Sequence, residues 1–416
     1  MKKYSSIKIE GTYLDLISKI EPNEFSLLKR DHQNYLLGWD LKEKLILDNN
    51  HADFLNLDNF ISENAGDYIF GLISYDLKNS IYQELSSENV THLAEEKSTF
   101  STFNNLIICN AGQLMYFGDE NKVAEVTSFF ENVKSSQDSN TEFELRSSED
   151  QKTYVDKIDR LKSLIQRGDI YEVNYCTAFH LHNKEVDSKN TFQKIQTATQ
   201  APYGAFVKSG DFDILCGSPE RFLKKKENKL YSQPIKGTAK RSENQLEDER
   251  LIKNLKSSIK EQAENVMIVD LVRNDLSKIA TKNSVLVEEL SKLYSFKSVH
   301  QLISTVSCQV NDSTTFTDIL KATFPMGSMT GAPKMNAMKF AESHEDFKRG
   351  YYSGAIGIIE PNGNFDFNVI IRSLIYNKSS HNSKVGVGGA ITILSDNHAE
   401  YEECLTKLKA IKDSVC

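Results

Sequence analysis

Apolar and polar positions along the chain alternate between helical and strand-like patterns. One segment has apolar residues at helical spacing: Tyr154, Ile158, Leu161 and Ile165. Gly168 follows them and is a typical end for the predicted helix. Ser148 and Gln151 before them predict a capping box at the start of this helix. A long helical region is predicted over about 243–278, and a final helix over about 397–415.

Strand-like runs occupy much of the remaining chain. We expect strands or hairpins over the following ranges: 67–78, 104–118 with a turn at 110–112, 170–181, 212–238 around a polar turn, and 350–377 with a turn at 361–363. Strands come in pairs with helices between the pairs. This order predicts an α/β fold of the α+β type, with mainly antiparallel sheet under helices.

One polar stretch divides the chain. Residues 135–151 contain few large aliphatic side chains and are typical of a linker. We therefore expect an N-terminal subdomain over 1–134 and a longer catalytic part over 152–416. No internal repeat is evident.

The length, composition and net charge of the chain argue against several classes of protein. With 416 residues and 39% hydrophobic residues, the chain is long enough for a sizeable core, and its net charge of −8 disfavours nucleic acid as a partner. We find no apolar run that could span a membrane and no signal peptide. Six cysteines are scattered without close pairs, which indicates reduced thiols in a cytoplasmic protein.

Carboxylates recur on two predicted helices. Glu400, Glu403 and Lys407 share one face of the C-terminal helix, while Glu264 precedes a strongly apolar stretch of the long helix. The alternative is a solvated face with an ordinary Glu–Lys pair at i,i+4. Carboxylates without nearby cysteine or histidine would favour Mg²⁺.

Lys236 stands in an unusual place, between Pro234 and Gly237 at the end of a strand-like run. A lysine is a nucleophile only when it is neutral, which requires burial or a neighbouring cation. The alternative is a surface lysine in a turn, and spacing alone favours this alternative.

Together these stretches resemble the chorismate-utilising enzymes. The residues that carry the resemblance occur in the order GSPERF, PIKGT, AENVMIVDLVRND, FPMGSMTGAPK, RGYYSGAIG, NVIIRSL and EYEEC, over about 170–410. The resemblance implies two large, mainly antiparallel sheets packed face to face with helices on the outside.

Within that family, a lysine in PIKGT is typical of aminodeoxychorismate synthase component I, where anthranilate synthases usually carry alanine. The resemblance implies Mg²⁺-dependent conversion of chorismate and ammonia to 4-amino-4-deoxychorismate, for 4-aminobenzoate and folate synthesis. The ammonia is expected from a separate glutamine amidotransferase subunit. The alternatives are anthranilate synthase component I and a non-catalytic homologue that binds chorismate or the amidotransferase.

The resemblance also implies roles for individual residues. Lys236 would attack C2 of chorismate as a neutral amine, and Glu220 would protonate the departing 4-hydroxyl. The Mg²⁺ ligands would be Glu264, Glu400 and Glu403. The substrate-binding residues would be Thr238, His300, Tyr352, Arg372, Gly388, Gly389 and Lys407.

Two positions depart from the family pattern. Glu172 stands where aminodeoxychorismate synthases typically have glutamine and where isochorismate synthases have lysine, so attack of water at C2 is not expected. Ala390 replaces a more usual third glycine. The sequence offers no reason why a glutamate is tolerated at position 172.

Overall fold

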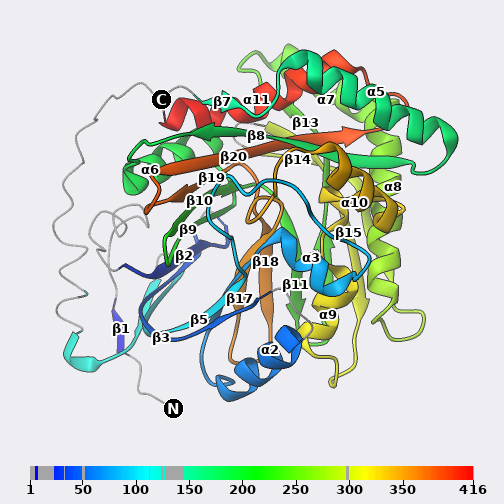
Figure 1. Ribbon diagram of the computed structural model, residues 1–416. Helices are drawn as coiled ribbons and strands as arrows, with labels where there is room; N and C mark the ends of the chain where they lie inside the picture. The colour runs from blue at the N-terminus through cyan, green and yellow to red at the C-terminus, as the bar shows by residue number, and fades with distance from the viewer. Residues whose placement is uncertain are drawn as a thin grey trace.

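The computed structural model describes residues 5–7, 23–31, 33–48, 52–111, 113–122, 126, 145–296 and 299–415. Figure 1 shows a large sheet system with helices on its outer side. None of the described helices is long and apolar enough to cross a bilayer. The five described cysteines are buried and free, as expected, while Cys416 lies outside the described residues.

The first half of the sheet system has the long buried strand β8 (Glu172–Leu181) near one edge. The hydrogen-bonded order of this half is β8, β20 (Asn382–Ile391), β19 (Ser373–Asn377), β10 (Phe212–Ser218), β9 (Tyr203–Ser209), β2 (Phe25–Lys29) and β3 (Tyr35–Ile46). Each of these pairs is antiparallel. Two short strands also pair with β8: β7 (Arg146–Ser147) and β16 (Gly331–Ala332).

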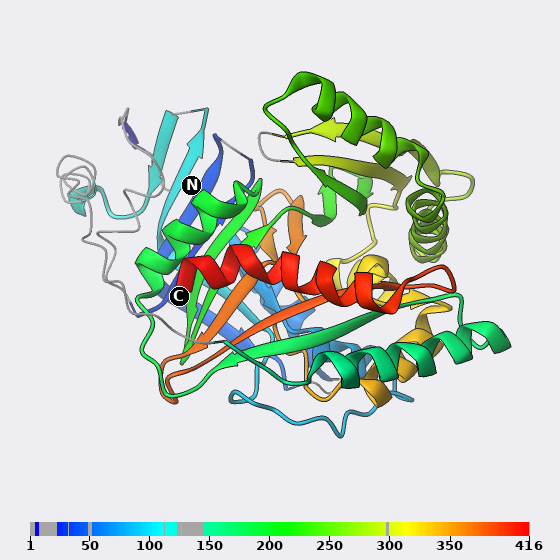
Figure 2. The same ribbon diagram turned by 90° about the horizontal axis from the view of Figure 1, so that it is seen from above.

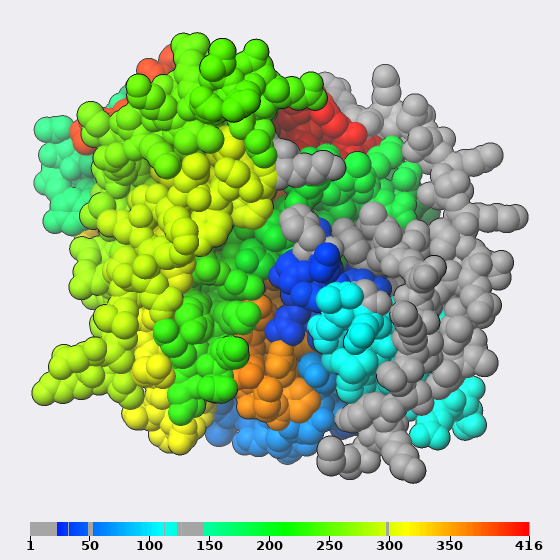
Figure 3. Space-filling view, turned by 180° about the vertical axis from the view of Figure 1, so that it is seen from behind, coloured from blue at the N-terminus to red at the C-terminus, as the bar shows by residue number. Residues whose placement is uncertain are grey.

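β5 (Thr99–Asn110) joins this half to the other, because it pairs with β3 along its length and with β4 at its start. The second half has the order β4 (Ile69–Ile73), β17 (Ala355–Ile359), β18 (Phe365–Val369), β11 (Arg221–Lys226), β12 (Lys229–Gln233) and β15 (Val299–Gln309). β15 also pairs with β13 (Ile235–Lys240) and β14 (Leu286–Ser295). At the far end of β5, β6 (Gln113–Phe117) carries β1 (Ser5–Ile7). In the space-filling view, the orange segment of β17 and β18 lies between green and blue segments, in agreement with this order (Figure 3).

Helices cover the outer surfaces. α5 (Gln151–Arg167), α6 (Ser188–Thr199) and α11 (Asn397–Val415) pack outside the first half, and α7 (Gln245–Ser257) and α8 (Ile259–Ser277) pack on β13 to β15. The other helices among the described residues are α2 (Ala52–Glu63), α3 (Lys78–Ile81), α9 (Phe316–Thr323) and α10 (Lys334–His344), with 3-10 turns at Tyr75–Leu77, Glu120–Lys122 and Gly327–Met329.

Two hydrophobic cores follow from this layering. One lies between the two halves of the sheet system and contains Phe70, Phe100 and Phe367; the other lies under the outer helices and contains Tyr154 and Phe206. The expected fold class is therefore confirmed. The two sheets are joined into one hydrogen-bonded system, and its two halves pack against each other through the first core.

The helical region predicted over about 243–278 is confirmed, but it consists of two helices. They are separated at Ser258, which has an extended ψ of 114° and whose hydroxyl accepts a hydrogen bond from the Glu261 amide, which caps α8.

Two local predictions were wrong. The strand predicted over 67–78 ends at Ile73 and is followed by the 3-10 turn at Tyr75–Leu77 and by α3. The cap of α5 is Asp150, which accepts from the Thr153 amide, rather than the box of Ser148 and Gln151.

The predicted linker over 135–151 falls partly outside the described residues, and its described end contains β7 and the start of α5. On either side of it, β2 and β4 from the first part of the chain pair with β9 and β17 from the second part. Strands from the two parts thus share one sheet system.

Candidate active site

Lys236 points into the protein interior. Its side chain is buried on β13, and its ammonium donates a hydrogen bond to Glu172 Oε1 at 2.9 Å. The backbone around it is fixed as well, because Asn265 of α8 donates to the Lys236 carbonyl oxygen at 2.9 Å and Gly237 adopts a φ of 91°. The alternative of a solvent-exposed turn lysine is excluded.

The expectation of a neutral amine is not met in this structure. Burial by itself lowers the pKa of Lys236, but the negative charges of Glu172, Glu264 and Glu220 outweigh it and raise the pKa above its ordinary value. Lys236 is therefore an ammonium here, paired with a buried carboxylate. The pairing also accounts for glutamate at position 172.

Glu220 lies between β10 and β11 and is buried. Burial raises its pKa to about 7, although the Ser328 hydroxyl, which donates to Glu220 Oε1 at 2.6 Å, acts in the opposite direction together with Lys236 and Lys407. A carboxyl group with such a pKa carries a proton for part of the time near neutral pH, which a general acid requires.

Carboxylates from α8 and α11 meet around a lysine that the sequence did not single out. Lys260 Nζ lies 2.6 Å from Glu400 Oε1 and 3.8 Å from Glu264 Oε1, while Glu403 pairs with Lys407 at 2.7 Å. Figure 2 shows α11, in red, passing beside the lobe that contains α7 and α8. Burial raises the pKa of Glu264 to about 7.

These three glutamates offer oxygen ligands of the kind that Mg²⁺ prefers. Within the described ranges, no three histidine, cysteine, aspartate or glutamate side chains are close enough together to hold a metal ion. However, Glu264 Oε1 is buried without a hydrogen-bond partner, and Lys260 already provides a positive charge at this place. The oxygen donors are of the kind that suits a hard divalent cation, while in this structure Lys260 holds Glu400 and Lys407 holds Glu403.

Glycines on β20 bring the strand backbone close to α11. Lys407 Nζ donates to the Gly388 carbonyl oxygen at 2.7 Å, and a Cβ added at Gly389 would lie 3.2 Å from Glu400 Oε2. A Cβ at Gly388 would come within 2.5 Å of the Tyr175 carbonyl oxygen on β8. The predicted Gly388, Gly389 and Lys407 are thus brought together next to Glu400.

Arg372 and Tyr352 lie in the same region. In the part of the chain that the structure describes, the Arg372 guanidinium makes no ion pair; burial lowers its pKa, with smaller opposing effects from Tyr352 and Glu403. The ring of Tyr352 packs on Gly386 of β20, where a Cβ would come within 2.3 Å of ring carbons. A guanidinium without a carboxylate partner is suited to bind one from a substrate.

Thr238 and His300 make other contacts. Thr238 is exposed, and its hydroxyl accepts from Gln301 Nε2 at 3.4 Å. His300 is buried, with its ring nitrogens 3.0 Å from Asp248 Oδ1 and 2.8 Å from Ser295 Oγ. Neither side chain contacts the group formed by Lys236 and Glu172.

Sequence reasoning missed three contacts of this site: Lys260 with Glu400, Ser328 with Glu220, and Glu172 with Lys236. The i,i+4 spacing of Lys260 and Glu264 was a readable signal for their own pair, but not for the contact of Lys260 with Glu400. All three contacts join residues far apart in the sequence, at separations of 140, 108 and 64 positions, so no local pattern could reveal them.

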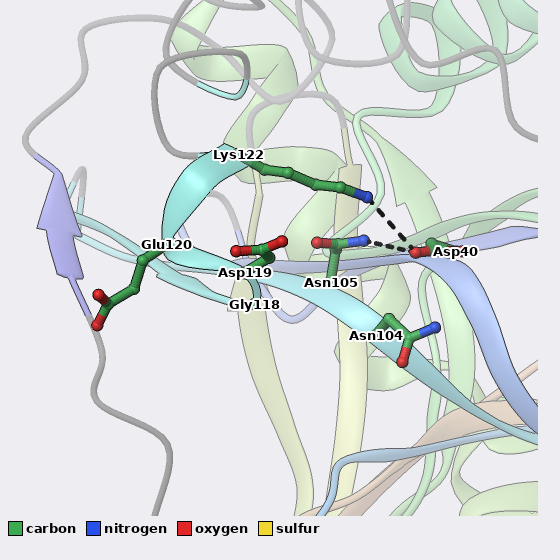
Figure 4. A pocket seen from close by; sticks show the side chains of 7 residues that line it. All are labelled: Asp40, Asn104, Asn105, Gly118, Asp119, Glu120 and Lys122. Atoms are coloured by element: carbon green, nitrogen blue, oxygen red, sulfur yellow. Dashed lines mark hydrogen bonds and ion pairs between the residues drawn. The ribbon is translucent and has the colours of Figure 1, made fainter.

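A separate surface hollow near β5 and β6 contains none of these residues. It is lined by Asp40, Asn104, Asn105, Gly118, Asp119, Glu120 and Lys122. As Figure 4 shows, its polar groups bond to one another: Asp40 accepts from Asn105 at 3.1 Å and pairs with Lys122 at 3.7 Å. None of the residues that line this hollow is among the predicted catalytic, metal-binding or substrate-binding residues.

Comparisons with known proteins agree with the resemblance. The family model described as chorismate binding enzyme matches residues 23–413. Aminodeoxychorismate synthase component 1 of Salmonella typhimurium is 36% identical over 258 residues, and the chloroplastic aminodeoxychorismate synthase of Arabidopsis thaliana is 38% identical over 265 residues. These matches cover 62% and 63% of this chain, but the chain spans only 56% and 29% of the two relatives.

Solved structures agree on the fold. Anthranilate synthase component I from Streptococcus pneumoniae superposes with a TM-score of 0.76 at 23% identity, over 95% of this chain and 93% of the other. The menaquinone-specific isochorismate synthase of Escherichia coli gives a TM-score of 0.76 at 16% identity, over 100% and 94%. At these identities the likeness is one of fold.

Proposed function

The chain belongs to the family of chorismate binding enzymes, and on this basis we propose that it aminates chorismate. The product is 4-amino-4-deoxychorismate, a precursor for 4-aminobenzoate and folate, and a glutamine amidotransferase subunit supplies the ammonia. The reaction is of the transaminase class. Relatives named for this activity support the proposal, because they are 36% and 38% identical to the matched segment.

One observation carries the proposal: a lysine buried among carboxylates, at the position where family members with this activity have lysine. Lys236 Nζ is 2.9 Å from Glu172 and is influenced by Glu220 and Glu264. Its amine forms a bond to C2 of chorismate, the ring double bonds shift, and the 4-hydroxyl departs. Ammonia then adds at C4 as the lysine leaves.

Glu220 supplies the proton that turns the departing hydroxyl into water, which its pKa of about 7 allows. Arg372, Tyr352, Lys407 and the backbone at Gly388 and Gly389 bind the carboxylates of chorismate. Thr238 and His300 stay outside this proposal, because their polar atoms are engaged with Gln301, Asp248 and Ser295.

Glu264, Glu400 and Glu403 would hold Mg²⁺. The orphaned Glu264 Oε1 and the all-oxygen donor set support this assignment. A bound Mg²⁺ supplies a positive charge that neutralises the ring carboxylate of chorismate.

The test is product identification. The protein is incubated with chorismate, Mg²⁺ and ammonium, with and without a separate glutamine amidotransferase, and the products are separated by mass spectrometry. We expect an aminated chorismate that keeps its enolpyruvyl group. Anthranilate with pyruvate would identify an anthranilate synthase instead. Binding of chorismate without any product would identify a non-catalytic homologue.

A further inference from the structure

Lys236 and Glu172 form a buried pair that joins distant parts of the chain. Lys236 is 8% exposed on β13 and Glu172 is 2% exposed at the start of β8. Their 2.9 Å hydrogen bond links two strands that are not neighbours in the sheet system. A buried ion pair of this kind contributes little net stability, so stability alone does not explain its presence.

The charges that face this pair come from several elements. The acidic neighbours are Glu264 and Glu261 of α8 and Glu220 between β10 and β11. The nearby lysines are already paired with other carboxylates: Lys260 with Glu400, and Lys407 with Glu403. Within the described residues, Glu172 is the side chain that accepts a hydrogen bond from Lys236 Nζ. A proton that leaves Lys236 therefore has an acceptor already in contact.

We propose that Glu172 is a catalytic base that removes the proton from the Lys236 ammonium in the amination of chorismate. The inference rests on the function proposed above. The proton moves along the existing hydrogen bond from Nζ to Oε1, which leaves a neutral amine and a neutral carboxylic acid. No water molecule is needed to carry the proton.

The atoms and charges then balance over the cycle. The free electron pair of Lys236 forms the bond to C2, and the electrons of the ring double bonds move toward C4, where the hydroxyl leaves with a proton from Glu220. When ammonia adds at C4, the lysine departs as a neutral amine and takes its proton back from Glu172. The surplus proton of the added ammonia returns to the Glu220 carboxylate.

A glutamine at position 172, which the family resemblance leads one to expect, would accept the same hydrogen bond but could not take the proton. Glu172→Gln is therefore the informative variant, because it keeps shape and hydrogen bond and removes only the base. We expect kcat at pH 7 to fall by about 100-fold, within the range for a general base.

The dependence on pH separates a base from a structural partner. Without Glu172, the amine must lose its proton to the solvent. The ratio of wild-type to Glu172→Gln kcat should then shrink about tenfold for each pH unit between pH 6 and 8, measured at constant free ammonia. Glu172→Asp keeps a carboxylate and should restore the wild-type profile at a lower rate. A ratio that is constant with pH, or a faster variant, would overturn the proposal.

A second measurement does not depend on turnover. The rate at which an amine-reactive anhydride modifies Lys236, followed by peptide mass spectrometry against pH, reports the pKa of Lys236 without substrate. Loss of the Glu172 charge should lower this pKa, and an unchanged value would overturn the pairing and the proposal with it. If the wild-type protein forms no 4-amino-4-deoxychorismate, the proposed function fails together with this step. Product formation with a constant ratio refutes the step alone.

Discussion

A lysine amine must lose its proton before its electron pair can form a bond to carbon. In Lys236 the resting state works against this loss, because three glutamates stabilise the ammonium more than burial disfavours it. The proposed mechanism therefore needs a nearby proton acceptor and not an amine that is neutral at rest. The Glu172 carboxylate, 2.9 Å from Lys236 Nζ, is in a position to be that acceptor.

Replacement of Lys236 should abolish amination without loss of the fold. Lys236→Ala removes the nucleophile, and we expect the rate of 4-amino-4-deoxychorismate formation to fall by at least about 100-fold. Any remaining turnover should shift toward anthranilate. Lys240→Ala, on the same strand but exposed, is the matched control and should keep wild-type rates. Wild-type formation of the product by Lys236→Ala would contradict the covalent mechanism.

The proton on Glu220 should set the upper pH limit of the reaction. Its pKa of about 7 means that the carboxyl group is protonated below pH 7 and ionised above it, so kcat should decrease as pH rises through about 7 at constant free ammonia. Glu220→Gln should lose this limb and about 100-fold or more of the rate. An unchanged pH limit in the variant would assign the acid to another group.

At the scale of elements, the approach of β20 to β8 and α11 shapes the site. β8 and β20 are paired over nine residues, so that Gly388 faces the β8 backbone and Gly389 faces the Glu400 carboxylate. The helices contribute through their first two turns: Lys260 and Glu264 lie early in α8, and Glu400 lies in the first turn of α11. Side chains at such positions are fixed by the packing of whole elements.

The two glycines should respond differently to the same substitution. Gly388→Ala places a methyl group 2.5 Å from the Tyr175 carbonyl oxygen, and we expect it to lower the free energy of unfolding by about 1–3 kcal/mol. Gly389→Ala meets no backbone atom at that distance and should keep stability, but raise KM for chorismate because the methyl lies against Glu400. Urea denaturation and steady-state kinetics measure the two effects. Equal losses of stability in both variants would contradict this geometry.

At the scale of the whole molecule, the site depends on residues from the middle and the end of the chain. Glu264 and Glu400 are 136 positions apart in the sequence. They converge where α8, which packs on one half of the sheet system, meets α11, which packs on the other half. A ligand held between them binds the folded state alone, since the unfolded chain does not bring these carboxylates together.

Mg²⁺ should therefore stabilise the folded protein. A concentration of 100 times Kd should add about 2.7 kcal/mol, visible as a higher Tm that EDTA reverses. Lys260→Met removes the competing ammonium and should bind Mg²⁺ more tightly, while Lys256→Met, exposed on α7, should behave as wild type. Thermal unfolding against Mg²⁺ concentration measures both. Full turnover in chelator would exclude the metal.

The sequence by itself determined the elements and the set of reactive side chains. Helical periodicity, strand-like runs and glycine stops are local properties, so α5, β8 and α11 were predictable, as was the gathering of Lys236, Glu220, Glu264 and Glu400 through motif resemblance. The break at Ser258 was missed, because a single capping residue competes weakly with a continuous helical pattern.

Only the tertiary structure decided the charge of Lys236 and the partners of each group. A pKa depends on burial and on charges within a few ångströms, and these charges come from strands and helices far apart in the sequence. Glu172, an unexplained departure in the sequence, accepts a hydrogen bond from Lys236 because the fold places Glu172 Oε1 and Lys236 Nζ 2.9 Å apart. Likewise, the ion pair of Lys260 with Glu400 exists only because the fold brings α8 and α11 together.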